Sequence, residues 1–102
     1  MSIKKRFLKS RPECKVTFRL SKGTAGKAES VHIVGDFNNW DTHATPMKKL
    51  KSGHFSTTLD LKVGSAYQFR YLIDGTDWLN DEGADKYVPS SYPGVENSVV
   101  EV

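Results

Sequence analysis

Hydrophobic and polar residues alternate with a period of two along most of this chain. The clearest run covers 67–73, where one side of an extended backbone carries Tyr67, Phe69, Tyr71 and Ile73. Such alternation indicates a strand with one buried face and one exposed face. No segment shows the 3.6-residue period of an amphipathic helix, so the pattern predicts an all-β chain.

Similar runs divide most of the chain into short strands. The predicted strands are 16–20, 31–35, 46–50, 55–61, 67–73 and 98–102. Turn-forming residues lie between them, and Asp74-Gly75 is a strong hairpin signal. The stretch 77–94 shows little regular pattern. The spacing predicts an immunoglobulin-like antiparallel β-sandwich of about seven strands.

The length of 102 residues suits one domain and leaves no room for a second. No run approaches the roughly 18 apolar residues of a membrane helix, so we expect no membrane partner. The basic N-terminus lacks the apolar stretch of a secretory signal. A single cysteine, Cys14, cannot form an internal disulfide, which fits a cytoplasmic location.

The charge is unevenly spread. Residues 1–28 hold nine Lys/Arg and one acid, while residues 29–102 hold six Lys/Arg and eleven acids. A basic head suggests a nucleic-acid arm, but Phe7 is the only aromatic residue among the first fifteen, and Phe18 follows the core pattern. We therefore expect no nucleic-acid partner. The chain divides into a basic N-terminal segment, 1–14, and a sandwich, 15–102.

Candidate catalytic and metal-binding residues form no known pattern. The three histidines, His32, His43 and His54, lie outside any nucleophile motif. The acids after 73 lack the spacing of a calcium loop and are interpreted as solvated turn residues; they are Asp74, Asp77, Asp81, Glu82 and Asp85. No glycine-rich phosphate loop is present. We expect no enzyme activity, no metal and no cofactor.

Two tryptophans lie outside the alternating runs, each shortly after a turn. A flat indole such as Trp40 or Trp78 can stack on the apolar face of a sugar ring, while polar neighbours bind the hydroxyls. Arg70 falls on the polar side of the aromatic strand, and its planar guanidinium could bind such hydroxyls. Equally, the tryptophans could pack beneath loops and Arg70 could be solvated.

Several of these residues fall within motifs that resemble carbohydrate-binding module family 48. The motifs are Val31-His-Ile-Val-Gly-Asp-Phe-Asn-Asn-Trp40, Tyr67-Gln-Phe-Arg-Tyr-Leu-Ile-Asp-Gly75, Trp78 and Asn97-Ser-Val-Val100. The family includes the glycogen-binding domain of AMP-activated protein kinase beta subunits. It also includes the N-terminal early-set domains of isoamylases and glycogen branching enzymes. The resemblance extends over 15–102.

The resemblance implies an early-set, immunoglobulin-like sandwich that binds α-1,4-linked glucans such as glycogen, starch or maltooligosaccharides without catalysis. It implies that Trp40 stacks on a glucose ring and that Trp78 completes the platform. Arg70 and Asn97 would bind sugar hydroxyls. These four are the predicted carbohydrate-binding residues.

The resemblance also places a sugar-contacting loop at Tyr92 and Pro93. The chain departs from the kinase-subunit pattern at Asp77, which adds one residue before Trp78. In enzyme-attached members the sugar site is often degenerate. The alternative function is therefore a protein-interaction or accessory module of glycogen metabolism, whose partner is a glycogen-metabolising enzyme or another protein.

Overall fold

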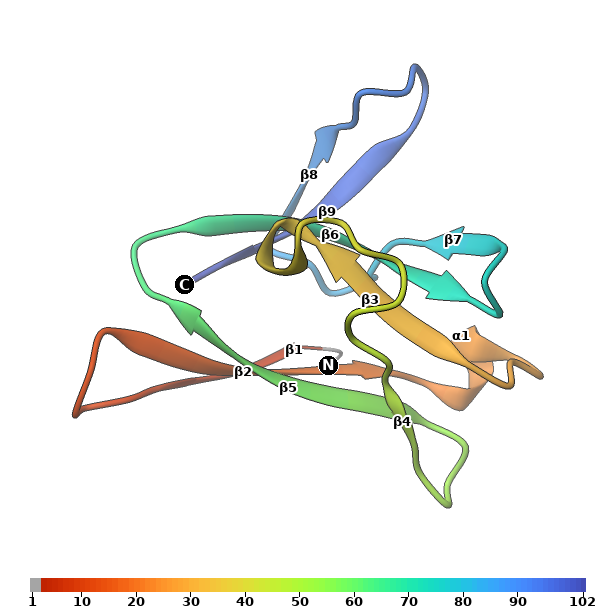
Figure 1. Cartoon of the computed structure of the whole chain (residues 1–102), viewed down its shortest axis with the longest axis horizontal. Helices are drawn as coiled ribbons and strands as arrows, with labels where there is room; N and C mark the ends of the chain where they lie inside the picture. Colours follow the sequence, from red (N-terminus) through yellow and green to blue (C-terminus); the bar gives the residue numbers. More distant parts are fainter. Residues whose placement is uncertain (1–2) are drawn as a thin grey trace.

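The computed structural model describes residues 3–102, which form two antiparallel sheets packed face to face (Figure 1). Sheet A has the order β1 (Ile3–Phe7), β2 (Glu13–Leu20), β5 (Phe55–Lys62), β4 (Lys48–Lys49). Sheet B has the order β3 (Val31–Gly35), β6 (Ala66–Ile73), β9 (Glu96–Glu101), β8 (Lys86–Pro89), with β7 (Asp77–Leu79) also paired to β6. The predicted all-β, immunoglobulin-like sandwich is confirmed.

The described residues contain nine strands rather than the predicted seven or so. β7 and β8 lie in the stretch 77–94, which shows little regular pattern, because three or four residues are too few to display alternation. Pairing with the longer strands β6 and β9 holds them. The predicted loop 21–30 contains a four-residue helix, α1 (Lys22–Ala25), and a 3₁₀ turn, η1 (Asp36–Asn38), follows β3.

The N-terminal segment supplies the edge strand of sheet A. β1 pairs with β2 from Ile3 opposite Phe18 to Phe7 opposite Cys14. Ile3 reaches the core, whereas Phe7 is exposed. Part of the basic segment 1–14 is therefore built into the sandwich.

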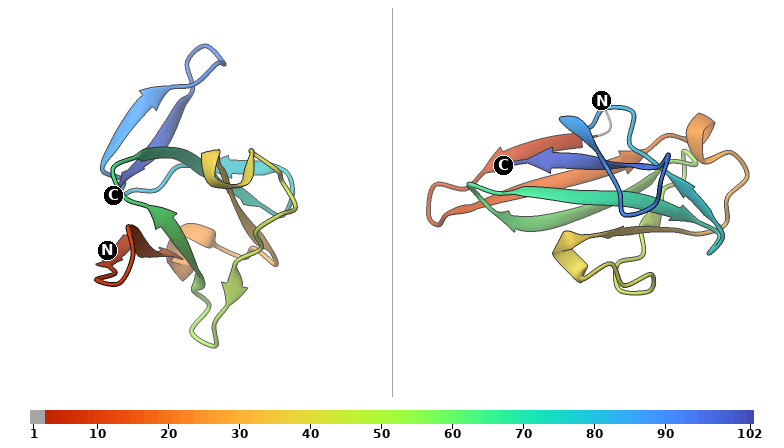
Figure 2. Two further views of the ribbon diagram at one scale, coloured as in Figure 1. Left: turned by 60° about the vertical axis from the view of Figure 1, so that its left-hand side comes forward. Right: turned by 90° about the horizontal axis from the view of Figure 1, so that it is seen from above.

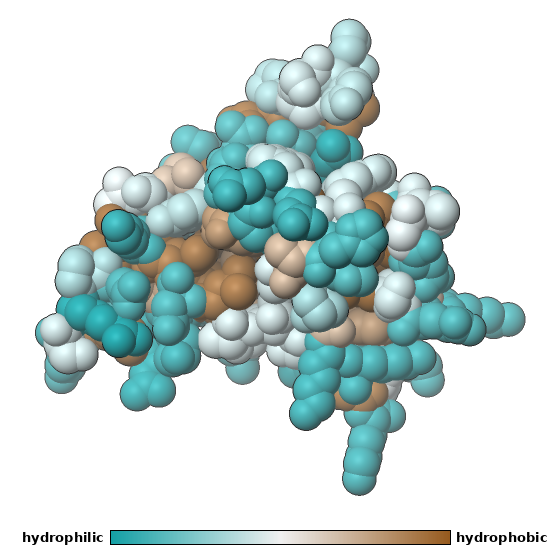
Figure 3. All heavy atoms as spheres, viewed as in Figure 1, coloured by the Kyte–Doolittle hydropathy of each residue, from teal (hydrophilic) through white to brown (hydrophobic). Residues whose placement is uncertain are grey.

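The inward faces of the two sheets form one aromatic core. Phe18 meets Phe69 at 5.1 Å between ring centroids, and Phe69 meets Tyr71 at 5.7 Å, both edge to face. All three are fully buried, and each aromatic side chain buried in this way contributes roughly 1.5–3 kcal/mol. Figure 3 shows apolar atoms between the layers, bordered by hydrophilic side chains. The predicted inward face of 67–73 is correct.

One acid of the predicted solvated group, Asp81, is instead buried, with 1% of its surface exposed. Its carboxylate accepts hydrogen bonds from the Tyr71 hydroxyl at 2.5 Å and from the Gly83 backbone at 2.7 Å. The Tyr87 hydroxyl donates to its carbonyl oxygen. Burial, together with the neighbouring carboxylate, raises the pKa of Tyr71 well above its ordinary value. Asp81 thus fixes the β7–β8 connection to the core.

The β8–β9 hairpin projects from the body of the sandwich (Figures 1 and 2). Its tip holds Tyr92, which is 67% exposed, and the exposed Pro93. The tip is held by its own hydrogen bonds, including one from the Ser90 backbone to the Val95 carbonyl at 2.9 Å.

Candidate functional site

The outer face of sheet B, which points away from the core, carries three of the four predicted site residues. Strand register pairs Val34 with Arg70. It pairs Leu72 with Trp78 across β6 and β7. Because side chains alternate along a strand, Arg70 and Leu72 share the outer face, and Trp78 joins them. Asn97 of β9 lies on the same face, because its side-chain amide donates to Gln68 Oε1 at 3.0 Å.

Arg70 and Trp78 are in direct contact. The guanidinium carbon lies 4.9 Å from the indole centroid, which is a cation–π geometry. Trp78 remains 40% exposed. The guanidinium lies over one face of the ring, so a ligand that stacks on Trp78 without displacing Arg70 would use the other face. The structure therefore joins the predicted aromatic platform and the predicted hydroxyl-binding group into one unit.

Two buried polar atoms on this face have no hydrogen-bond partner among the described residues. They are Arg70 Nε, a donor, and Asn97 Oδ1, an acceptor. Asn97 is 6% exposed, and its amide nitrogen donates to Gln68 Oε1 at 3.0 Å. An unsatisfied buried polar group costs roughly 1–3 kcal/mol. Both atoms are shielded from solvent in the free protein.

The turn before Trp40 is built by two residues of its motif. A Cβ added to Gly35 would lie 2.7 Å from Phe69 Cβ and collide with the Gln68 carbonyl oxygen, so only glycine allows β3 this close to β6. Asn38 accepts from the Gly35 backbone at 3.1 Å and donates to the Ile33 carbonyl at 3.0 Å. These bonds fix the direction in which the chain leaves β3.

Trp40 is half-buried and is held by Asp36. The indole Nε1 donates to Asp36 Oδ1 at 2.8 Å, and the Gln68 backbone donates to Asp36 Oδ2 at 2.8 Å. Trp40 is thus linked to β6, and through the Gln68 side chain to Asn97. The sequence reasoning missed Asp36 and Gln68 as positioning residues. Asp36 stands inside the motif that ends at Trp40, so the signal was present.

The predicted loop residues Tyr92 and Pro93 stand apart from the other four. They lie at the hairpin tip beyond β8, where the Tyr92 backbone donates to Ser90 Oγ at 3.1 Å (Figure 2). Within residues 3–102, no hydrogen bond or ring contact joins them to Trp40, Arg70 or Trp78. Their role in a sugar site stays a prediction.

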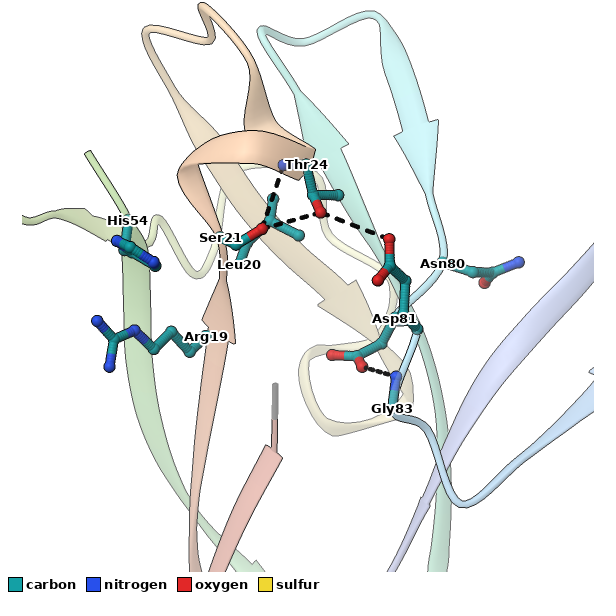
Figure 4. Close-up of a pocket in the computed structure, with 9 residues that line it drawn as sticks. Arg19, Leu20, Ser21, Thr24, His54, Asn80, Asp81 and Gly83 are labelled. Carbon is teal, nitrogen blue, oxygen red and sulfur yellow. Dashed lines mark hydrogen bonds between the residues drawn. The ribbon is translucent and has the colours of Figure 1, made fainter. Parts of the chain in front are cut away.

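Two hollows flank the sandwich. The larger, about 550 Å³, lies beside α1 (Figure 4) and is lined by Arg19, Leu20, Ser21, Thr24, His54, Asn80, Asp81, Glu82 and Gly83. None of these is a Phe, Tyr or Trp side chain on which a sugar could stack. The smaller, about 310 Å³, includes Trp78. No group of three His, Cys, Asp or Glu residues within 3–102 is placed to hold a metal ion.

Comparisons with known proteins point to one family. The sequence model of carbohydrate-binding module 48 (isoamylase N-terminal domain) matches residues 11–92. A 1,4-alpha-glucan branching enzyme GlgB from Butyrivibrio fibrisolvens is 38% identical over 63 residues, which are 62% of this chain and 10% of that enzyme. The chain therefore spans a tenth of this relative's length.

No helix among residues 3–102 is long and apolar enough to cross a membrane.

Proposed function

Because the chain belongs to the carbohydrate-binding module 48 family, we propose that it binds α-1,4-linked glucans such as glycogen, starch and maltooligosaccharides without catalysing a reaction. The observation that carries this proposal is the contact of the Arg70 guanidinium with the exposed Trp78 indole, 4.9 Å from the ring centroid, on the outer face of sheet B. A sugar ring can stack on the indole while its hydroxyls accept hydrogen bonds from the guanidinium.

In the proposed complex, one sugar ring stacks on the open face of the Trp78 indole. Hydroxyls of the bound sugar contact Arg70 and Asn97, and Trp40, held by Asp36, offers a second stacking surface. The face is open and shallow, and each hydrogen bond to sugar replaces one to water. Affinity is therefore modest, and it depends on several sugar units binding together.

The test is calorimetric titration of the chain with maltoheptaose. Arg70→Met keeps the apolar stem of the side chain but removes Nε and the cation. We expect it to weaken binding about tenfold, as for the loss of a charge-assisted hydrogen bond. The matched control is Arg19→Met, which removes an exposed arginine from the outer face of sheet A and should leave binding unchanged.

Two outcomes would contradict the proposal. One is the absence of any heat at millimolar maltoheptaose from chain that melts cooperatively. The other is full affinity in both Arg70→Met and Trp40→Ala. A weaker but measurable affinity in each variant, with an unchanged melting temperature, supports direct contact with the sugar.

One observation favours the alternative of a protein-interaction module. The strands of sheet A carry eight Lys/Arg and two acids, so this sheet presents a basic surface to any acidic partner. Under this alternative the sugar face is vestigial, and folded chain would give no heat with maltoheptaose. The same titration therefore separates the two functions.

A further inference from the structure

The smaller hollow lies beside the proposed sugar face, at the end of sheet B where β6 turns into β7. A row of outward side chains crosses three strands there, because His32 pairs with Leu72 and Leu72 pairs with Trp78. The opposite wall comes from the loop after Trp40, which contributes Thr42 and His43. Trp78 lines the hollow, whereas Arg70 does not.

The polar groups of this hollow have hydrogen-bonding capacity to spare. The two imidazole rings meet edge to face at 6.2 Å between centroids. Thr42 Oγ1 and His43 Nδ1 lie 3.1 Å apart. Within residues 3–102, Nε2 of His43 and both ring nitrogens of His32 have no hydrogen bond. The hollow thus joins an aromatic surface to several free donors and acceptors.

The walls are held by hydrogen bonds to the sheet. The loop 41–47 runs along β3, with the Ile33 backbone donating to the Thr45 carbonyl at 3.1 Å and Met47 donating to Val31 at 2.8 Å. On the other side, Asp74 Oδ1 accepts from the Glu29 and Ser30 backbones at 2.8 and 2.9 Å. The hollow is therefore formed before any ligand arrives, which lowers the cost of binding.

We propose that this hollow is a separate subsite, which takes one further pyranose ring of a glucan already bound at Arg70 and Asn97. The inference rests on the proposed function. A hollow of about 310 Å³ is at the lower end of ligand pockets, so it suits a single ring. His43, His32 and Thr42 would bind its hydroxyls, and the edge of the Trp78 indole would border the ring.

A subsite of this kind acts only on chains long enough to reach it. The effect of losing His43 should therefore grow with the length of the glucan. For His43→Ala we expect a three- to tenfold loss of affinity for maltoheptaose, about the value of one hydrogen bond. For maltotriose the loss should be less than about twofold, because a short chain fills the Arg70–Asn97 position alone.

The matched control is His54→Ala. This histidine lies in the β4–β5 hairpin, outside the smaller hollow, and like His43 it has its Nδ1 beside a hydroxyl, Ser52 Oγ at 2.9 Å. It should leave the affinity for both sugars unchanged. A second readout is the NMR signals of the imidazole nitrogens, where His43 should shift with maltoheptaose far more than with maltotriose, and His54 with neither.

The outcomes separate this inference from the proposed function. If maltoheptaose does not bind the folded chain, the proposed function fails. If Trp40→Ala and Arg70→Met weaken binding but His43→Ala does not at any length, the subsite alone is overturned. An equal loss for both sugars also overturns it, because His43 would then belong to the first position.

Discussion

The two sheets of this sandwich are both antiparallel, but their outer faces differ in surface chemistry. The strands of sheet A carry eight Lys/Arg and two acids, whereas those of sheet B carry two and three. On sheet A the central hydroxyls of Thr17 and Thr58 bond each other at 3.0 Å. On sheet B the centre holds an exposed indole and two buried polar atoms without partners in residues 3–102.

The two faces also differ in how their polar groups meet water. Sheet A has exposed ion pairs, such as Lys15 with Asp60 at 3.3 Å, whose groups water also satisfies, so they contribute little. Sheet B keeps Arg70 Nε and Asn97 Oδ1 away from water at a free-energy cost.

The largest expected effect comes from a substitution at Gly35, where β3 approaches β6 closely in sheet B. In Gly35→Ala the new Cβ meets backbone and Cβ atoms that cannot move aside. We expect the free energy of unfolding to fall by about 3 kcal/mol, the upper range for overpacking. Denaturation by urea measures it. Glucan affinity should fall too, because Trp40 follows this turn.

The control for that substitution lies on the other side of the molecule. A Cβ at Gly23, in α1, meets nothing within 4 Å. Gly23→Ala should therefore leave stability unchanged or raise it by up to about 1 kcal/mol, since alanine favours helix. Equal losses in both variants would show that the close contact at Gly35 is not the cause.

A smaller effect is expected at the buried carboxylate. Asp81→Asn removes the charge that accepts the Tyr71 hydroxyl, and it leaves a buried network mismatched. We expect a loss of about 2 kcal/mol in the free energy of unfolding. Asp60→Asn, on the outer face of sheet A, should cost less than about 1 kcal/mol. Similar losses of unfolding free energy in both variants would contradict the expectation that a buried acid contributes more than a solvated one.

The long strands could be predicted from the sequence because their alternation has a direct physical cause. In 67–73 each second residue must enter the core, and the structure buries Phe69 and Tyr71 as expected. The same period placed Arg70 outward. Its contact with Trp78 could not be foreseen, because β7 is three residues long and its register with β6 depends on the Asp74-Gly75 turn.

Two features could not be predicted from the sequence, because each depends on residues that only the fold brings together. Asp81 stands among acids of a turn-rich stretch, and only packing against Tyr71 and Ser98 shows that it is buried. The smaller hollow is lined by His32, which lies on β3, and by His43, which lies in the loop after Trp40. Residue type and local spacing do not reveal such contacts between distant residues.

The smallest expected effect concerns Asp74 and Asp85, two acids whose carboxylates accept backbone hydrogen bonds. Backbone hydrogen bonds from Ser30 and Glu29 lower the pKa of Asp74. Burial opposes the same shift at Asp85, but the Glu101 backbone and Lys5 outweigh it and lower its pKa. Lys5 belongs to sheet A and Glu101 to sheet B, and the Lys5–Asp85 ion pair measures 2.7 Å.

A lowered folded pKa stabilises the fold above the unfolded value, near 4, and that stability is lost as pH falls through the folded value. The melting temperature should therefore fall between about pH 4 and pH 2. Asp85→Asn keeps an acceptor for Glu101 but loses the ion pair, so it should melt slightly lower at pH 6 and lose less on acidification. Thermal melts across this range measure both. If the melting temperature of Asp85→Asn falls on acidification as far as that of the unmodified chain, then Asp85 does not couple the two sheets. The contrast between their faces would then arise within each sheet alone.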